Sequence, residues 1–179
     1  MKQFFLITAF ICAFIVAGAQ AVLTPADAGS KVHFVIRNLG FKTGGDLGGL
    51  KGAIKFDQKN ITATAFDVTV SVSTIDSDNE MRDSHLKKEE YFDAEKYPTI
   101  HIVSTRIQPA TTAGTYLFTG NLTIKGTTKE IKFPFTVTAK DGGQLFLGEF
   151  EINRRDYKVG GSSISMSDDL TVSLSVLAK

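Results

Sequence analysis

The chain of 179 residues carries 20 basic and 19 acidic side chains, and Lys2 is the only charged residue before position 22, so the remainder is neutral overall. This balance argues against nucleic-acid binding, which depends on clustered Lys and Arg to neutralise phosphates, and against a polybasic membrane tether. The single cysteine, Cys12, lies in the same early segment, so we expect neither disulfides nor thiolate chemistry in residues 22–179.

The N-terminal segment has the features of a secretory signal peptide. A basic residue precedes an apolar run at 4–16 that only Thr8 interrupts, and small residues follow the run. A membrane-spanning helix needs roughly 20 apolar residues, so removal of the segment is favoured over a membrane anchor. We therefore predict a signal peptide at 1–21, cleaved after Ala19 or Ala21, and a periplasmic or secreted protein.

Residues 22–179 form the predicted domain, which is long enough to bury its own core. No stretch within them is long and apolar enough to cross a bilayer as a helix. From Lys31 onward apolar and polar residues alternate, which predicts strands with one buried face. Val32, Phe34 and Ile36 share the first such face, and the same period recurs at 50–56, 66–73 and 170–176. A further candidate strand at 100–107 has an ambiguous face, and another segment follows a turn at 146–153.

The clearest pair of strands lies between positions 115 and 140. Apolar rows starting at Tyr116 and Ile131 flank a turn at Gly126-Thr127-Thr128, which predicts a long antiparallel hairpin. Pro134 falls inside the second row, and because proline lacks a ladder N–H it indicates either an opening in the sheet or a bulge. About eight strands without alternating helices predict an all-β sandwich or up-and-down barrel.

Residues 76–98 break this alternation, since they are densely charged and contain a histidine. Ser77-x-x-Glu80 has the form of a capping box, which predicts a short helix at about 78–87. Pro98 ends the segment because proline cannot continue a helix. We therefore predict a short helical insert at about 77–97.

Five segments carry a resemblance to a known family, and they are 34–40, 49–57, the insert at 82–98, 120–129 and 153–157. In this order they resemble the YceI-like family of secreted bacterial lipid-binding proteins. The resemblance implies a lipocalin-like antiparallel β-barrel that holds a polyisoprenoid chain non-covalently in its interior. The family often has an aromatic residue near Leu47 and a glycine near Lys158, and these departures leave the identity of the ligand open.

The ligand type implied by the resemblance fits the residues. An isoprenoid tail offers only apolar surface, so its site needs an apolar wall with few polar groups. We predict that the wall consists of Phe34, Ile36, Phe56, Phe66, Val68, Val70, Phe118, Leu122, Phe133, Phe135 and Phe150. A barrel of about eight strands is wide enough to hold a small ligand or to be filled by side chains, so a filled core is the alternative.

A lid or head-group region is predicted at Arg82, His85, Leu86, Phe92, Arg154 and Asp156. For Arg154 and Asp156, bracing of the helical insert is favoured over binding of a head group. Asp83-Ser84-His85 is no catalytic triad, because triads are assembled by geometry from distant segments and neighbours on a helix point in different directions. The three histidines lack metal-ligand spacing, so we expect no catalytic site and no metal.

These observations predict a non-enzymatic protein that binds a polyprenyl chain or an isoprenoid quinone for transport, storage or sequestration. The rival prediction is a stress-response or interaction protein whose barrel is solid and takes no lipid. The expected partner is the isoprenoid lipid alone, without nucleic acid or further cofactor, and a homodimer is left open.

Overall fold

The computed structural model describes residues 22–179, so the predicted signal peptide at 1–21 lies outside the described residues. The strands are β1 Val22–Leu23, β2 Pro25–Asn38, β3 Phe41–Leu47, β4 Lys51–Lys55, β5 Ala65–Ser71, β6 Thr99–Pro109, β7 Thr115–Ile124, β8 Thr127–Lys140, β9 Gly143–Asn153 and β10 Met166–Ala178. The helical elements are the α-helix α1 Glu80–Leu86 and the short 3-10 helices η1 Ile61–Ala63, η2 Val72–Thr74 and η3 Arg154–Tyr157.

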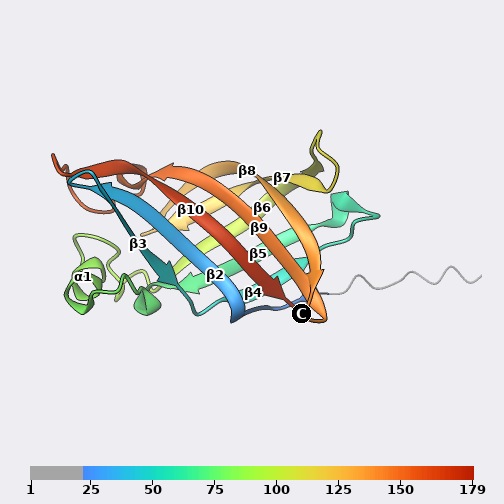
Figure 1. The fold of residues 1–179 in the computed structure, drawn as a ribbon, viewed down its shortest axis with the longest axis horizontal. Coiled ribbons are helices and arrows are strands. Elements are labelled where there is room, and N and C mark those ends of the chain that lie inside the picture. The colour runs from blue at the N-terminus through green and yellow to red at the C-terminus, as the bar shows by residue number, and fades with distance from the viewer. Residues whose placement is uncertain (1–21) are drawn as a thin grey trace, which may run out of the picture.

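The strands form one curled antiparallel sheet in the order β1-β4-β5-β6-β7-β8-β9-β10-β2-β3, a half-barrel with α1 at one end (Figure 1). The predicted all-β, barrel-like fold with one short helical insert is therefore confirmed. The sequence predicted about eight strands, whereas the described chain has ten. The two that were missed are β1, which has two residues, and β3, in which Gly44-Gly45 interrupts the alternation.

Two backbone contacts bring distant parts of the curled sheet together. β1 pairs with β4 while β2 pairs with β10, and between them Thr24 and Lys179 exchange backbone hydrogen bonds of 2.7 and 3.1 Å. Asp46 in β3 and Asp76 before α1 exchange a second pair, of 2.7 and 3.0 Å. The first contact links the end of β1 to the end of β10, and the second links edge strand β3 to the segment after η2, so the sheet curls round an interior.

The hairpin predicted between 115 and 140 is present as β7 and β8. It turns at Lys125-Gly126, where both residues have positive φ (48° and 69°), as two-residue hairpin turns require. The turn predicted at Gly126-Thr127-Thr128 is therefore misplaced, because Thr127 and Thr128 are already paired in β8. Pairing between β8 and β9 begins only at Phe135, so residues 127–134 of β8 have no partner in β9. Pro134 therefore marks an opening in the sheet, which is the first of the two alternatives that its position predicted.

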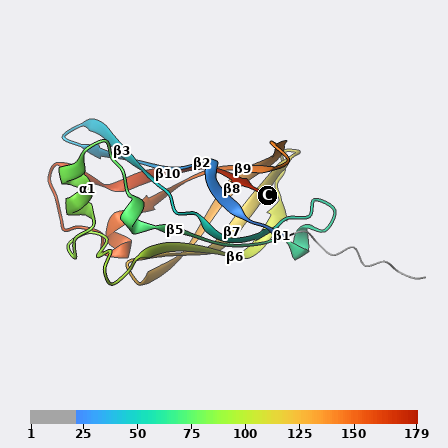
Figure 2. The same cartoon turned by 90° about the horizontal axis from the view of Figure 1, so that it is seen from below.

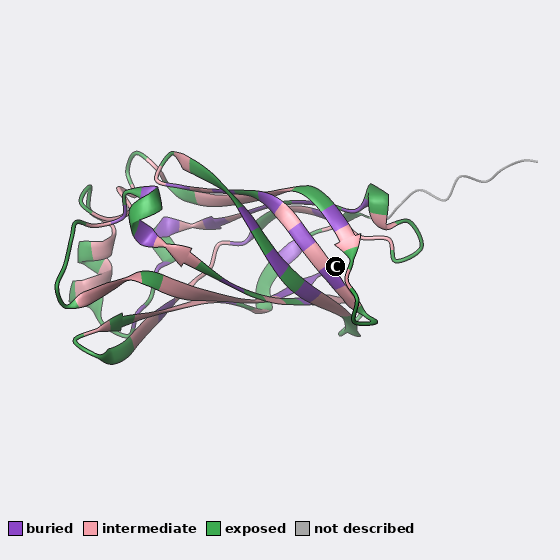
Figure 3. Ribbon diagram, turned by 90° about the horizontal axis from the view of Figure 1, so that it is seen from above, coloured by how far each residue is buried: buried purple, intermediate pink, exposed green. Residues whose placement is uncertain are grey.

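Aromatic side chains fill much of the interior. Phe118 and Phe133 are opposite one another in the hairpin register and stack with ring centroids 4.8 Å apart, and Phe133 also stacks on Phe150 at 4.8 Å. Gly148 makes room for this stack, because a Cβ there would lie 2.8 Å from the Phe133 ring. Buried positions alternate with more exposed ones along several strands (Figure 3).

Helix α1 is shorter than predicted and has a different cap. Asn79 is the N-cap, and its side-chain oxygen accepts a hydrogen bond of 2.9 Å from the backbone N–H of Arg82. The predicted capping box at Ser77 and Glu80 is therefore wrong. The Ser77 hydroxyl instead donates to the Asp83 carboxylate, because the chain reverses at Asp78, whose φ is 58°.

Replacing Asn79 with alanine is expected to lower the free energy of unfolding by about 1 kcal/mol, because the helix loses its N-cap hydrogen bond. Asn60 offers a matched control, since it is the N-cap residue of η1 but its side chain bonds no backbone N–H of that helix, and accepts only an exposed hydrogen bond from the Thr62 hydroxyl. Urea unfolding of both alanine variants measures the difference. Equal losses for Asn79→Ala and Asn60→Ala would contradict the assignment.

Candidate functional site

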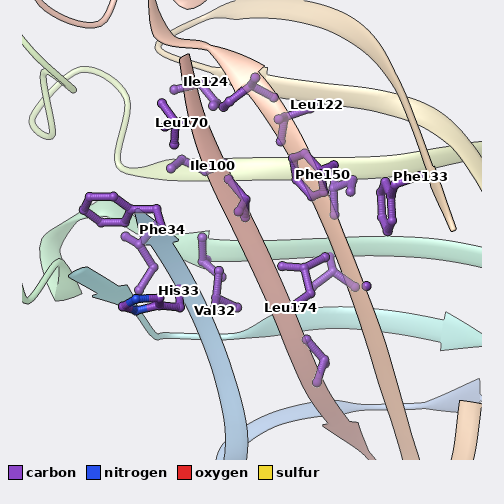
Figure 4. A pocket seen from close by; sticks show the side chains of 18 of the residues that line it. Val32, His33, Phe34, Ile100, Leu122, Ile124, Phe133, Phe150, Leu170 and Leu174 are labelled. Carbon is purple, nitrogen blue, oxygen red and sulfur yellow. The ribbon is translucent and has the colours of Figure 1, made fainter. Parts of the chain in front are cut away.

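An elongated apolar cavity of about 210 Å³ lies inside the half-barrel (Figure 4). Leu170, Val172, Leu174 and Val176 of β10 all line it, because alternate residues of a strand face the same side. From 170 to 176 the wall extends roughly 20 Å at about 3.3 Å per residue. The shape therefore suits a long, narrow apolar ligand better than a compact one.

Ten of the eleven side chains predicted to line a ligand site lie on the cavity wall, and they are Phe34, Ile36, Phe66, Val68, Val70, Phe118, Leu122, Phe133, Phe135 and Phe150. Phe56 does not line the cavity. It follows the last residue of β4 and packs edge-on against Tyr116 and Phe146, with ring centroids 5.2 and 5.7 Å away. Phe56 alternates in step with Ile54, as the sequence indicated, but its ring packs against these two aromatic rings and not along the cavity. That the wall residues contact a lipid stays a prediction.

The wall also contains residues that the sequence analysis did not assign to it. Val32 and the inward row of β10 could have been found, because their strands alternate clearly. Tyr91 and Met166 lie in or next to irregular segments and line the cavity at the α1 end, a position that periodicity does not reveal. Most wall residues are apolar or aromatic, and the exceptions are His33, Thr69, Gly148 and Arg154.

Only part of the predicted lid region lies on the cavity wall. Leu86, Phe92 and Arg154 line the cavity, whereas Arg82, His85 and Asp156 do not. Arg82 turns back along its own segment, where Nε donates to the Ser77 hydroxyl at 2.7 Å. The His85 ring packs edge-on against Tyr91 at 4.9 Å. The histidine therefore positions a wall residue without reaching the cavity itself.

Arg154 is the charged side chain in the wall, and it is only 4% exposed. Its Nη1 donates to the carbonyl oxygens of Val159 (3.0 Å) and Gly161 (2.9 Å). Its Nε donates to the Ser167 carbonyl at 2.9 Å, and Nη2 donates to the Asp168 carboxylate at 2.6 Å. Four of the five guanidinium donors are thus used inside the protein. The arrangement holds the 154–161 turn against the start of β10.

The same turn is attached to the helical insert. The Gly160 N–H donates to the Glu90 carbonyl at 3.0 Å. From the β7–β8 turn, Lys125 Nζ donates to the carbonyls of Glu89 (2.6 Å) and Lys158 (3.1 Å). These contacts join the insert, the hairpin turn and the 154–161 turn at one end of the barrel. Arg154 contributes to this joint by holding its own turn. The Asp156 carboxylate accepts no hydrogen bond from any residue in the described range 22–179. That the two residues brace the insert stays a prediction.

Tyr157 is buried in the wall at 2% exposure. Burial, and secondarily the neighbouring Asp156 carboxylate, raise the pKa of its hydroxyl from 10.0 to about 12. The unfolded chain therefore releases this proton near pH 10, whereas the folded protein keeps it until about pH 12. The contribution of Tyr157 to stability is present below pH 10 and is lost as the pH rises toward 12.

We expect the wild type to lose more stability than Tyr157→Phe when the pH is raised from 9 to 11.5, because phenylalanine has no proton to release. Urea unfolding at the two pH values measures this difference. A second readout is the absorbance of tyrosinate, in which the late-titrating component should vanish in Tyr157→Phe. Identical pH dependence of the two proteins would contradict the raised pKa.

The histidines on the strands are paired with carboxylates. Nδ1 of His33 lies 2.5 Å from Oδ1 of Asp46, and Nε2 of His101 lies 2.7 Å from Oδ1 of Asp67. Across residues 22–179, no group of three or more potential ligands from His, Cys, Asp and Glu is arranged to hold a metal ion. In the same residues no helix has the length and hydropathy needed to cross a membrane.

Comparison with known proteins gives matches over most of the chain. A family model described as YceI-like domain matches residues 23–178. A UPF0312 protein of Pectobacterium carotovorum subsp. carotovorum is 33% identical over 102 residues, which are 56% of this chain and 52% of that protein. Protein YceI of Salmonella arizonae is 35% identical over 115 residues, 63% of this chain and 56% of that protein. The chain spans about half the length of the curated relatives it matches.

Solved structures show the same fold. BcnA of Burkholderia cenocepacia superposes with a TM-score of 0.81 at 28% identity, covering 87% of this chain and 99% of BcnA. A polyisoprenoid binding domain from Saccharophagus degradans gives a TM-score of 0.67 at 12% identity, covering 90% of this chain and 99% of that domain. The second likeness concerns the fold alone.

Proposed function

Because this chain belongs to the YceI-like domain family, we propose that its cavity binds the polyisoprenoid chain of a lipid, a polyprenyl chain or an isoprenoid quinone. The observation that carries the proposal is the elongated apolar wall, which runs along β10 and β2 and continues beneath the helical insert. Removal of apolar surface from water contributes about 2.5 kcal/mol per 100 Å². A bound tail therefore gains affinity in proportion to the length that enters the barrel.

The cavity offers little to a charged head group. The charge of Arg154 is balanced by Asp168, and its donors are occupied by carbonyl oxygens. A buried ion is stable only when it is paired, so an uncharged head group fits inside and a phosphate would remain at the mouth. This supports a tail-first mode of binding, with the head group at the end that Leu86 and Phe92 line.

The proposed role is to shelter an apolar chain from water during transport, storage or sequestration, without catalysis. The solved domain of Saccharophagus degradans that shares this fold is a polyisoprenoid binding domain, which supports the ligand class. We further propose that residues 1–21 are a signal peptide and that the protein works in the periplasm or outside the cell. Such a location would place it among membranes that contain isoprenoid lipids.

Mass spectrometry of an organic extract of the gently purified protein tests the ligand class. We expect an isoprenoid lipid in about equimolar amount, and a thermal-shift series with prenyl alcohols of increasing length should show rising stabilisation. Ligand at 100 times its Kd stabilises the folded state by about 2.7 kcal/mol, or roughly 5–10 °C for a domain of this size. A lipid-free protein that no prenyl chain stabilises would refute the proposal in favour of the interaction protein without lipid.

A further inference from the structure

Exposed apolar side chains gather on two neighbouring loop tips at the α1 end of the barrel. Leu39 and Phe41, in the β2–β3 hairpin, are 73% and 76% exposed, and Ile164 in the loop before β10 is fully exposed. The Leu39 N–H donates to the Ser165 carbonyl at 2.7 Å, so the two tips are joined. Figures 1 and 2 show the hairpin and the start of β10 together at this end.

The exposed Leu39 has a backbone conformation that is unusual for leucine. Leu39 and Gly40 form the two-residue turn of the hairpin, with φ values of 52° and 82°. Such turns favour Asn or Asp before Gly, because a left-handed conformation is unfavourable for other side chains. Neither turn preference nor packing within the chain accounts for a leucine here. An exposed apolar side chain on a strained turn indicates a contact outside the chain.

Two cations flank the apolar tips. Arg37 and Lys42 are cross-strand partners close to the turn of the hairpin, and both are exposed. Neither forms an ion pair with any residue of the described segment 22–179. The carboxylates at the start of β10 have other partners, since Asp168 binds Arg154 and Asp169 accepts a hydrogen bond from Asn153.

We propose that this tip cluster, defined as Leu39, Phe41 and Ile164 with Arg37 and Lys42, docks on the surface of a bilayer that contains anionic phospholipids. Apolar side chains that enter the head-group region, together with adjacent basic residues, are what interfacial binding needs. A stable protein interface requires about 800 Å² on each partner, which three side chains on protruding tips do not provide. A bilayer is therefore the better match.

Docking in this way would present the cavity to the membrane. Ile36 and Met166 line the cavity and lie a few residues behind Leu39 and Ile164. Insertion of the tips would bring this end of the barrel to the head groups. The inference goes beyond the proposed function and stands without it, because an empty barrel would dock in the same way.

Vesicle flotation tests the inference, and it uses residues 22–179 because they contain the whole sheet and its core. The vesicles are phosphatidylcholine alone, or phosphatidylcholine with 30 mol% phosphatidylglycerol. The test variant is Leu39→Asn/Phe41→Ser/Ile164→Ser, in which asparagine suits the left-handed turn. Val22→Ser is the matched control, since Val22 is 52% exposed and lies in β1, at the end of the barrel away from α1 (Figure 2). Circular dichroism and the unfolding midpoint establish that each variant is folded.

We expect the wild type to float with the anionic vesicles, the triple variant to bind at least tenfold more weakly, and Val22→Ser to bind like the wild type. A second variant, Arg37→Gln/Lys42→Gln, should lose the preference for phosphatidylglycerol and its sensitivity to salt. Equal flotation of the wild type and the triple variant, or no flotation at all, would overturn the inference. So would a wild-type dimer in sedimentation velocity that ignores vesicles and becomes monomeric in the triple variant.

Discussion

Replacing Arg154 with alanine is expected to lower the free energy of unfolding by about 3 kcal/mol, because its buried guanidinium makes four hydrogen bonds and each contributes about 1 kcal/mol. The variant leaves the buried carbonyl oxygen of Val159 and the partly buried one of Gly161 without their donor, and an unpaired buried acceptor is costly. The 154–161 turn, which hydrogen-bonds to Glu90 through Gly160, should loosen with it. Urea unfolding at pH 7 measures the effect.

Arg155 provides the matched control, because it has the same side chain on the same turn but is exposed. Arg155→Ala should change stability by less than about 0.5 kcal/mol. Arg154→Lys keeps the charge but lacks the planar fork of donors, so it should recover only part of the loss. If Arg154→Ala proves as stable as Arg155→Ala, the buried network is not what holds this end of the barrel.

Replacing Val172 with phenylalanine is expected to weaken the apparent affinity for the ligand at least tenfold, while the protein stays folded. Val172 lines the cavity from the middle of the inward row of β10. A larger ring there would occupy the space that the proposed tail requires. Because the cavity can accept the added atoms, we expect the unfolding midpoint to remain within about 3 °C of the wild type. Uptake is measured with a prenyl alcohol by thermal shift and by extraction.

The control for this variant is its neighbour. Thr171 is on the outward side of the same strand, where it pairs in register with Val35 and Glu151. Thr171→Phe adds a ring of the same kind outside the barrel and should leave uptake unchanged. Undiminished uptake by folded Val172→Phe would show that the lipid binds elsewhere. Equal loss in both variants would indicate a general disturbance of β10.

Much of the fold follows from alternation in the sequence. The rows that contain Phe118 and Phe133 read directly as the two faces of a hairpin, and the structure places these rings in contact. Ten of the predicted lining residues lie on the wall of one cavity. Alternate residues of a strand face the same side, so the apolar rows in the sequence identify the face that points inward. The family resemblance, carried by five short segments, is confirmed by the match over residues 23–178.

The rest depends on information that alternation does not contain. Alternation predicts that Phe56 faces inward, yet its ring packs against Tyr116 and Phe146 and does not line the cavity. This contact joins segments that are distant in the sequence. Whether the barrel is hollow depends on how the rings tilt and on space left by residues such as Gly148. The cap of α1 is Asn79 and not Ser77, because the chain reverses at Asp78 and Ser77 then donates to the Asp83 carboxylate, a contact that the sequence pattern does not reveal.

The pairing of β2 with β10 has a consequence for how the protein is made. Ser30 and Leu177, which hydrogen-bond across this pair, are 147 residues apart. Contacts of such long sequence separation form slowly, and here they cannot begin until the C-terminal strand has left the ribosome. The chain therefore spends much of its synthesis without a finished barrel. Pairing of β10 with β2 is then expected to be a late step of folding.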